Sequence, residues 1–544
     1  MAEQTRVLVV GAGPTGLAVA CELLRAGVPV RVVEAGTERS PRSKGIAIWP
    51  RTLEILHDLG IAEEATARGL PLRKGTLWSQ GQPLTTFDLT DLRSRFGWGL
   101  VLPQYETESL LERRLVELGG KVEKGVRCAE LSWSASGLPR VALVSSAGTE
   151  QAEVDWLIAC DGPGSTIRAA AGIDMAGELE RYGWVLADVR MDTELPRDGV
   201  NWFLHRDAVL HALPMPGDQW RLTMTVGRER PDPAQWPVER IQRILDERSP
   251  VPMRLSTAEW VSGFRVRQGI ARQFRRGRVL LAGDAAHVHS PAGAQGVNAG
   301  LQDAANLGWK LALVCRGDAS PTLLDSYDAE RRPAASLTVR LANRATRGAT
   351  LASAAARAGR DLIWSTAGRR GVVQRVVPPA VSGVLQSYPA GLTAASGPLL
   401  AARRLRSVVD LVRGRPGTGA RLPDVRLVDG WLWDLLPATG PVVLAWAGRG
   451  RAWDDVDGFT ALHRAVPRDV PVLVFDSPGA PADAIPDSPR WRVVADFGGR
   501  VRRALAAGPD TAVVVRPDRY LGARGSSASP GAVRSYFKTV GGTP

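Results

Sequence analysis

The stretch Gly11-Ala12-Gly13-Pro14-Thr15-Gly16 decides the fold prediction. It follows the apolar run Arg6–Val10, which is typical of a buried strand, and it opens a helical pattern over Pro14–Ala26. Gly27 suits the position just past a helix end, and a second β-branched run, Val28–Val33, comes next. A glycine-rich turn between strand and helix, with a second strand behind it, predicts a β-α-β unit of a parallel sheet.

The residue types in this turn suit a nucleotide. Gly11 permits the tight turn, Gly13 lets a pyrophosphate approach the backbone, and Gly16 allows the helix to pack closely on the sheet. The helix N-terminus, where Thr15 lies, offers N–H groups and a positive dipole end to phosphates. Glu34 ends the second strand and can accept hydrogen bonds from ribose hydroxyls. Such glycines can be purely structural, but the complete context predicts dinucleotide binding, without choosing between FAD and NAD.

The rest of the chain divides into three kinds of segment. Residues 180–265 hold short runs broken by Pro, Gly and Asp, which indicate an inserted antiparallel sheet with strands near Trp184–Met191, Trp202–Met215 and Trp220–Val226. The flanking regions predict helices at Thr52–Leu59, Glu106–Leu118 and Gly300–Val314, and a buried strand at Val279–Ala282. A Gly/Pro/Arg cluster at Arg413–Pro423 marks a boundary. Beyond it we expect a small α/β domain with strands at Val442–Ala447, Val472–Phe475 and Thr511–Val515 and a helix at Phe459–Ala465.

The charge of the chain raises the question of nucleic acid. The net charge is +13 and the pI about 10.2, so such a partner has to be considered. Only six of the 69 basic residues are lysine, and the arginines are spread through the chain rather than gathered in one stripe. We therefore predict diffuse surface charge and no nucleic-acid partner.

Cysteines and apolar runs bound the class further. Cys21, Cys128, Cys160 and Cys315 form no C-x-x-C pair, and their spacing suits neither a metal site nor a disulfide framework. No apolar run is long enough to span a membrane, and no basic segment followed by an apolar stretch opens the chain. We expect a cytoplasmic protein with reduced thiols, no membrane contact and no metal.

Two later segments carry a family resemblance. Arg278–His287, with Gly283-Asp284 at its centre, resembles the Gly-Asp motif of the single-component (class A) FAD-dependent aromatic hydroxylases, which include the phenol hydroxylases and polyketide-tailoring enzymes. The segment Ser290–Ala304 resembles the loop and helix start that lie against the flavin ring in that family. The resemblance implies FAD contacts for Gly283, Asp284 (to the ribityl chain), Gly296, Val297 and Asn298, and places Pro291 beside the reactive flavin C4a.

Further positions follow from the same resemblance. Cys160–Arg168 resembles the family's Asp-Gly motif, which implies contacts of Asp161 and Arg168 with FAD and the nicotinamide pyrophosphate. Arg42 and Gln104 match other flavin contacts. Plainer roles compete: Asp284 can cap a helix, Arg168 can be a surface ion pair, and His287 and His289 can be ordinary loop residues. The family usually has two glycines where this chain has Gly293-Ala294, a departure that bears on flavin mobility or ring access.

The resemblance also implies the domain arrangement. It is an α/β fold with a Rossmann-like FAD-binding domain formed by residues 1–180 and 266–400, with part of 73–100 contributing to the substrate region. Residues 181–265 form the substrate-binding antiparallel sheet, and residues 410–544 form a thioredoxin-like domain without redox cysteines. Stability or subunit contact is the expected role of the last domain, and a homodimer stays open.

The implied reaction is hydroxylation of an aromatic, phenolic ring, with a polycyclic polyketide as the expected substrate. NADPH or NADH reduces FAD, O2 adds at flavin C4a, and the hydroperoxide delivers one oxygen atom. Only one dinucleotide-binding unit is visible, so the nicotinamide is expected to visit transiently. Two alternatives stay open: Baeyer–Villiger oxygenation of a polycyclic ketone or quinone, and a flavin-binding protein without catalysis.

The sequence does not reveal a catalytic base. The inserted sheet offers polar and aromatic candidates for substrate contact, namely Tyr182, Trp202, His205, His211 and Trp220. A structural role is the stronger expectation for any single one of them, because polar and aromatic side chains in a sheet usually belong to its core or rim.

Overall fold

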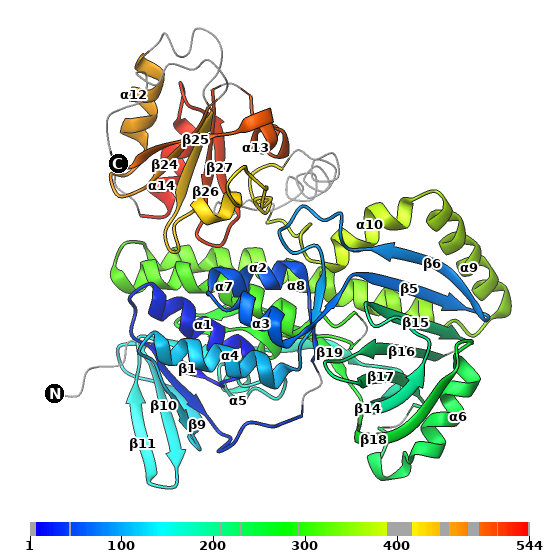
Figure 1. Cartoon of the computed structure of the whole chain (residues 1–544). Helices are drawn as coiled ribbons and strands as arrows, with labels where there is room; N and C mark the ends of the chain where they lie inside the picture. The colour runs from blue at the N-terminus through cyan, green and yellow to red at the C-terminus, as the bar shows by residue number, and fades with distance from the viewer. Residues whose placement is uncertain are drawn as a thin grey trace.

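The computed structural model describes residues 7–42, 45–206, 208–228, 230–291, 293–388, 416–446, 456–476, 489–508 and 510–541. Figure 1 shows a central α/β part, a sheet domain on its right and a C-terminal domain above it. The first residues of the described chain run straight into the central sheet, as the sequence predicts.

A six-stranded sheet forms the centre, with strand order β20-β21-β12-β1-β2-β8. All neighbouring strands are parallel except β20 with β21. The short Val/Leu/Ile runs of β1 and β12 are buried along their whole length, as parallel strands covered on both faces must be. The strands are β1 (Val7–Val10), β2 (Arg31–Glu34), β8 (Val122–Lys124), β12 (Trp156–Ala159), β20 (Arg275–Arg276) and β21 (Val279–Leu281).

Helices cover this sheet. α1 starts at Pro14, a residue that suits the first helical position, and it packs against both α4 and α7. One continuous apolar core joins these helices to the strands. The helices of the central part are α1 (Pro14–Arg25), α2 (Pro50–Asp58), α3 (Ala62–Arg68), α4 (Gln104–Glu117), α5 (Thr166–Ala170), α7 (Gly296–Arg316) and α8 (Asp325–Ala349).

Three small sheets complete the central part. An antiparallel meander, β9 (Arg127–Trp133), β10 (Pro139–Ser145) and β11 (Gly148–Glu153), projects from one end (Figure 1). The other two sheets have the strand orders β3-β7-β4 and β13-β19-β22. Their strands are β3 (Ala47–Ile48), β4 (Leu70–Leu72), β7 (Gly99–Val101), β13 (Met175–Leu179), β19 (Arg267–Ala271) and β22 (His287–Val288).

The sheet domain is a single seven-stranded sheet with order β18-β14-β17-β16-β15-β5-β6. Adjacent strands within this sheet are antiparallel, except that β15 and β5 are parallel. Two of its strands come from residues 74–88, the region that the sequence predicts to contribute to the substrate part. The strands are β5 (Lys74–Ser79), β6 (Gln82–Asp88), β14 (Gly183–Thr193), β15 (Gly199–His205), β16 (Ala208–Pro214), β17 (Gln219–Val226) and β18 (Met253–Phe264).

The two faces of this sheet pack differently. One face packs on α6 (Val238–Arg248) through a core that includes Phe203 and Leu222. The other face carries Trp184 and Leu204 and turns toward the end of α8. Two more helices, α9 (Ala354–Arg369) and α10 (Val372–Val381), pack on β6 (Figure 1).

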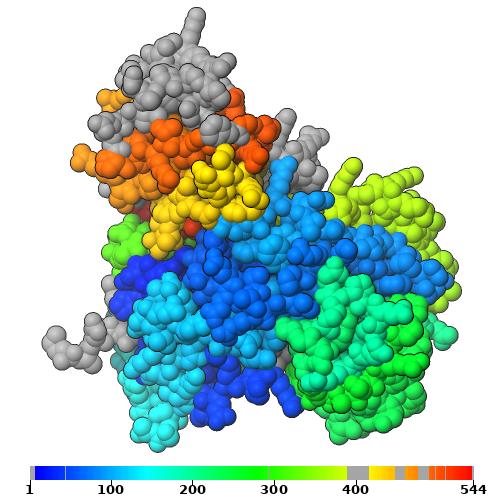
Figure 2. Space-filling view, viewed as in Figure 1, coloured from blue at the N-terminus to red at the C-terminus, as the bar shows by residue number. Residues whose placement is uncertain are grey.

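The C-terminal domain has a mixed five-stranded sheet, β25-β24-β23-β26-β27. β23, β24 and β25 are parallel, whereas β26 and β27 are antiparallel to their neighbours. Its elements are β23 (Val442–Trp446), α12 (Val456–Ala465), β24 (Val472–Asp476), β25 (Trp491–Ala495), α13 (Arg500–Ala504), β26 (Thr511–Val515), β27 (Leu521–Ser526) and α14 (Gly531–Thr539). Trp309 and Leu323 of the central part join one of its apolar cores, and Figure 2 shows the domain seated directly on the central part.

Most predicted elements are present, with shifted ends. The expected strand Val28–Val33 starts later, as β2, and the single run Trp202–Met215 is two strands joined by a turn at Arg206, where φ is +40°. The predicted boundary Arg413–Pro423 lies partly outside the described residues. Within the described ranges, no helix is long and apolar enough to cross a membrane and no cluster of three metal-binding side chains occurs. None of the four cysteines forms a disulfide.

Candidate flavin site

The glycine turn leaves room where a phosphate is expected. Gly11 has φ +102°, and a Cβ there would lie 2.3 Å from the Cys160 carbonyl oxygen. A Cβ on Gly16 would lie 1.9 Å from the Gly11 oxygen, so both positions require glycine for packing. A Cβ on Gly13, by contrast, would have no described atom within 4 Å of it. The turn therefore has an open approach at the N-terminus of α1, as a bound pyrophosphate needs.

Glu34 stabilises the same turn from the end of β2. Its Oε2 accepts a hydrogen bond from the Ala12 backbone N–H at 2.8 Å, and its Oε1 accepts one from Gly36 at 2.9 Å. Each carboxylate oxygen can accept more than one hydrogen bond, so the group still has acceptor capacity for ribose hydroxyls. Glu34 is thus both a support of the turn and a fitting ribose ligand.

The Gly-Asp motif forms a short 3₁₀ turn over Gly283–Ala285, directly after β21. Gly283 has φ +62°, and a Cβ on it would lie 2.6 Å from Thr15 Oγ1. A Cβ on Gly300 would lie 2.1 Å from the same oxygen. The Thr15 side chain therefore packs between the turn and α7, a role that the sequence does not suggest. Asp284 is exposed between two buried neighbours, on the open side of the turn.

Asp303 on α7 holds this turn from behind. Its Oδ2 accepts from the Gly283 N–H at 3.0 Å and lies 2.6 Å from His287 Nε2, while its Oδ1 accepts from Arg331 Nε at 2.7 Å. All these side chains are buried. Although burial disfavours the carboxylate, the charges of His287 and Arg331 lower the pKa of Asp303 to about 2. Sequence reasoning missed Asp303, because only its long-range partners distinguish it from any helix aspartate.

The second histidine of the motif continues this chain of contacts. His289 Nε2 lies 2.9 Å from His287 Nδ1, and burial lowers the pKa of His289 to about 3, so its ring is neutral. His287 thus lies within hydrogen-bond distance of both Asp303 and His289. Both histidines belong to the support of the Gly-Asp turn, although the sequence leaves an ordinary loop role open for His287 and favours it for His289.

The loop that follows is fixed by Asn298. Its Oδ1 accepts from the Trp49 N–H at 2.8 Å, and its Nδ2 donates to the Ala47 and Ala294 oxygens at 2.9 and 2.8 Å. Trp49 Nε1 donates to the Gly293 oxygen at 3.1 Å. The Asn298 side chain, predicted to contact the flavin, thus braces the loop against β3. Half-buried Pro291 lies at the start of this loop.

Ala294 occupies a position that favours glycine. Its φ is +51° and that of Gly293 is +90°. A left-handed backbone costs a residue with a side chain about 1–2 kcal/mol. This strain is the physical reason to expect glycine at the second of the two positions.

Other predicted contacts meet near the start of α7. A Cβ on Gly45 would lie 2.9 Å from both Gln104 Oε1 and Val297 Cγ2, so these two side chains flank one backbone position. Gly296, the first residue of α7, has open space around it. Arg42 is exposed in a turn in which Ser40 Oγ donates to its carbonyl oxygen. It lies on the segment that leads to Gly45, but residues 43 and 44 are outside the described chain.

The Asp-Gly segment contacts the Gly-Asp turn. Arg168 donates to the Ala285 oxygen at 2.9 Å and to the Pro163 oxygen at 3.0 Å, so it links the two motifs instead of forming a surface ion pair. Asp161 Oδ2 caps α5 by accepting from the Ile167 N–H at 3.3 Å. Its Oδ1 is buried and accepts no hydrogen bond from the described residues. A ligand donor such as a ribityl or ribose hydroxyl would satisfy that atom.

The predicted substrate residues separate onto the two faces of the seven-stranded sheet. Trp202 and His211 are paired across β15 and β16, with ring centroids 6.4 Å apart, on the face that turns toward the central part. Trp202 also packs in a cluster with Trp49 and stacks on Phe87 at 5.9 Å. His211 is 6% exposed, and burial lowers its pKa to about 4. On this face Trp202 therefore contacts both Trp49, which is bound to Asn298, and the neutral imidazole of His211.

The remaining three residues lie elsewhere. Trp220 is buried in the core against α6, on the opposite face of the sheet. His205 lies on that side too, because its Nδ1 is 3.9 Å from Glu247 of α6. Tyr182 precedes β14 and lies under the guanidinium of Arg181 at 5.3 Å. The structure therefore brings together only Trp202 and His211 of the five.

Glu180 is a further residue that no sequence pattern singles out. Its Oε1 accepts from Ser290 Oγ and its Oε2 from Trp184 Nε1, both at 2.7 Å. The side chain is buried, and burial raises its pKa. Ser290 directly precedes Pro291, and Trp184 lies 5.9 Å from the His211 ring. Glu180 thus connects the seven-stranded sheet to the loop predicted to lie beside the flavin.

A glycine turn, an acidic residue at the end of the next strand and a Gly-Asp turn meet at the carboxyl ends of parallel strands, an arrangement typical of dinucleotide-binding proteins. A family model described as "FAD binding domain" matches residues 4–342, and the chain belongs to this family. FAD is therefore its cofactor, and the resemblance noted from the sequence is confirmed.

The relatives and solved structures that the chain resembles include monooxygenases and a hydroxylase. The chain is similar to 6-methylpretetramide 4-monooxygenase of Streptomyces rimosus, with 39% identity over 61% of this chain and 60% of that protein. It is 38% identical to 12-dehydrotetracycline 5-monooxygenase/anhydrotetracycline 6-monooxygenase of the same species, over 60% of this chain and 67% of the relative. The solved structure of the anhydrotetracycline hydroxylase OxyS from S. rimosus covers 100% of both chains at 30% identity, with a TM-score of 0.73.

Proposed function

We propose that this chain is an FAD- and NAD(P)H-dependent monooxygenase that places one atom of O2 on an aromatic ring of a polycyclic substrate. The observation that carries the proposal is the convergence on Gly283 of Thr15 from the glycine turn and Asp303 from α7, with Arg168 bound to the same turn. Three segments distant in sequence thereby support one open turn, as an FAD site requires.

The residues present fit the cofactor. The open approach at Gly13 and the N-terminus of α1 would hold the pyrophosphate, Glu34 the ribose, and exposed Asp284 the ribityl chain. Bound FAD would supply the redox chemistry, taking electrons from NAD(P)H and activating O2. The protein's own task is then to position the ring, hold the substrate and exclude water.

The substrate would lie between the loop at Pro291 and the sheet face that carries Trp202 and His211. Since burial lowers the pKa of His211 to about 4, its imidazole is neutral at pH 7 and can accept a hydrogen bond from a phenolic hydroxyl. Glu180 would position the Ser290–Pro291 backbone relative to Trp184. Trp220 and His205, on the α6 face, are not part of this proposed chamber.

The substrate class follows from the relatives. Two of them are named for pretetramide and tetracycline compounds, and a solved structure of aklavinone-11 hydroxylase, 25% identical over 99% of this chain, holds FAD and aklavinone. These names support a fused-ring polyketide as the substrate class here. The alignment with the first relative spans only 60% of its length, so the substrate itself is open to experiment.

The finer domain arrangement is part of the proposal. The central part would be the FAD-binding domain and the seven-stranded sheet the substrate-binding domain. The strand order of the C-terminal sheet, with β23 and β24 parallel and β26 and β27 antiparallel beside β23, supports a thioredoxin-like domain. Trp446 and Phe475 fill its core, and neither Cys nor a redox pair occurs in its sequence.

One experiment tests the function. The purified protein, reconstituted with FAD, is expected to show flavin absorbance that NADH or NADPH bleaches and air restores, with faster bleaching when a fused-ring phenol is added. The product's NMR spectrum distinguishes hydroxylation, which leaves the ring intact, from Baeyer–Villiger oxygenation, which inserts an ester oxygen. Failure to retain FAD, or NAD(P)H consumption that no aromatic compound stimulates, would contradict the proposal.

A further inference from the structure

The turn between β26 and β27 of the C-terminal domain carries a buried arginine fork. Arg516 donates through both terminal nitrogens to the two carboxylate oxygens of Glu330 on α8, at 2.6 and 2.9 Å. The same guanidinium donates to Asp518 at 2.6 Å. The side chains of all three are at most 1% exposed. A bidentate pair between two domains is a geometrically specific contact, not only a favourable charge pairing.

Helix α7 completes this network. Lys310 Nζ donates to Glu330 Oε2 at 2.7 Å, and Asn306 Nδ2 donates to the same oxygen at 2.8 Å. Despite burial, which disfavours the carboxylate, Arg516 and Lys310 lower the pKa of Glu330 to about 2. Two buried cations therefore face the two anions Glu330 and Asp518. Removing one cation would leave a buried carboxylate undercompensated, which is costly.

The neighbouring residue on α8 leads to the flavin site. Arg331 donates to Asp303 at 2.7 Å, and Asp303 in turn accepts from the Gly283 N–H. Arg331 also donates to the Tyr388 hydroxyl at 3.1 Å, and the Tyr388 ring lies 4.3 Å from that of Tyr520 in the C-terminal domain. Glu330 and Arg331, successive residues of α8, thus bind Arg516 of the C-terminal domain and Asp303 behind the Gly-Asp turn, respectively.

We propose that docking of the C-terminal domain and binding of FAD are coupled, and that Arg516 is a positioning residue for the Gly283–Asp284 turn. By fixing Glu330, Arg516 fixes the helical turn that presents Arg331 to Asp303, and Asp303 holds the turn in its FAD-binding form. The inference rests on the proposed flavin site. It gives the C-terminal domain a role in cofactor retention that needs no thiol chemistry.

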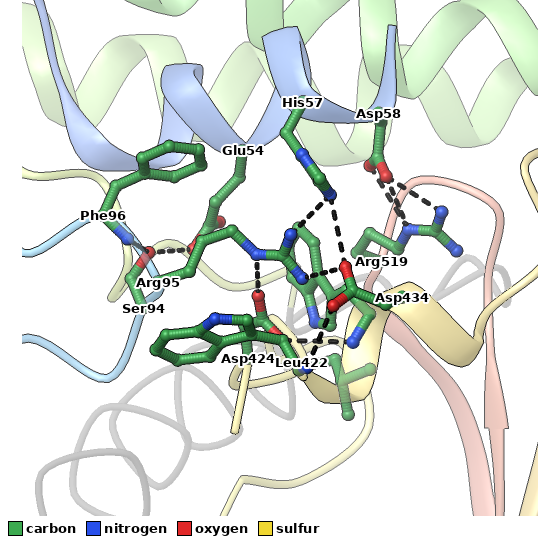
Figure 3. A network of polar contacts seen from close by, with 12 residues as sticks. Glu54, His57, Asp58, Ser94, Arg95, Phe96, Leu422, Asp424, Asp434 and Arg519 are labelled. Atoms are coloured by element: carbon green, nitrogen blue, oxygen red, sulfur yellow. Dashed lines mark hydrogen bonds and ion pairs between the residues drawn. The ribbon is translucent and has the colours of Figure 1, made fainter. Parts of the chain in front are cut away.

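The same interface provides a matched control. Figure 3 shows that Arg519 instead pairs with Asp58 at the end of α2, at 2.9 Å. Nearby, Arg95 of the central part pairs with Asp424 and Asp434. The Arg519–Asp58 pair also joins the two domains, with side chains 4% and 9% exposed, but it ends on α2 instead of α8. Loss of Arg519 therefore removes one contact between the domains and leaves the Arg516–Glu330 pair in place.

The first measurement is FAD affinity, by quenching of flavin fluorescence, for the wild type, Arg516→Met and Arg519→Met. We expect Arg516→Met to raise the FAD dissociation constant by at least about fivefold, the lower end of usual coupling between sites. Arg519→Met should keep the FAD dissociation constant within about twofold of the wild type, because Arg516 still holds Glu330 in this variant. Equal effects of the two substitutions, or no effect of Arg516→Met, would overturn the coupling.

A second measurement does not depend on a variant folding. Because coupling is reciprocal, FAD should slow amide hydrogen exchange in β26 and β27 of the wild-type protein. Unchanged exchange in these strands, with FAD shown to be bound, would overturn the inference and leave the proposed function standing. A wild-type protein that binds no FAD at all would instead refute the proposed function.

Discussion

The Asp303 carboxylate is the contact whose loss should cost the central part most. Three donors converge on its two oxygens: the Gly283 N–H, His287 Nε2 and Arg331 Nε. Asp303→Asn keeps the shape but turns one oxygen into an NH2 group. Whichever way the amide is oriented, it meets a donor, and the buried Arg331 loses its counter-charge.

The size of this effect follows from burial. Asp303 is 0% exposed and Arg331 1%, and removing one partner of a buried ion pair costs about 3–5 kcal/mol. We expect the free energy of unfolding to fall by that amount and Tm by roughly 3–7 °C, because the unfolding entropy of so long a chain is large. FAD binding should weaken as well, because Gly283 loses its support.

The assay is urea unfolding followed by circular dichroism, with flavin fluorescence recorded in parallel. Asp325→Asn is the matched control: it also removes an aspartate–arginine pair of α8, but the Asp325 side chain is 69% exposed. An exposed pair of this kind contributes about 1 kcal/mol or less. A loss below about 1 kcal/mol for Asp303→Asn, equal to the control, would refute the reasoning.

Four further outcomes follow from the site. Lowering the pH should destabilise the wild type more than Asp303→Asn, because the pKa of Asp303 in the folded protein, about 2, lies below its ordinary value of 3.8. The contribution of Asp303 to stability is complete above pH 3.8 and is lost as the pH falls through 2, which acid unfolding curves of both proteins would record. Gly13→Ala should weaken FAD binding at least about tenfold while the free energy of unfolding changes by less than about 0.5 kcal/mol. Gly16→Ala should instead unfold the turn, so thermal melts that show both variants equally destabilised would contradict this expectation. Ala294→Gly should stabilise the protein by about 0.5–1 kcal/mol through relief of its positive φ, and a loss in urea unfolding would speak against strain. In Glu180→Gln the amide oxygen can replace the carboxylate as acceptor for only one of Ser290 and Trp184, so the peroxide released per NAD(P)H should rise roughly 2–10-fold with FAD affinity unchanged. A variant that releases no more peroxide than the wild type would exclude the positioning role of Glu180.

The sequence predicted the nucleotide end well, because that signal is local. The Gly11–Gly16 turn, the strand ahead of it and Glu34 lie within one short stretch whose spacing is fixed by backbone geometry. The resemblance then pointed to the Gly-Asp segment, and the family match confirms the resemblance itself.

What the sequence could not predict depends on contacts between distant segments. Asp303 is one aspartate among many until Gly283 and Arg331 are brought to it, and Glu180 becomes notable only beside Ser290 and Trp184. Asn298 was expected to contact the flavin, and only the structure shows that its amide holds the loop. For the same reason the sequence could not assign Trp202 and Trp220 to opposite faces of the seven-stranded sheet.

The sheet that carries Trp202 and His211 is not a contiguous insertion. β5, which forms a hairpin with β6 within residues 74–88, pairs in parallel with β15, more than a hundred residues later in the chain. If residues 183–264 alone were transplanted into a relative, β15 would lose β5 and would have to pair with the relative's own hairpin. A mismatch there would leave β15 as an unpaired edge strand, which is prone to aggregation. An exchange of specificity between such enzymes therefore has to move both pieces together.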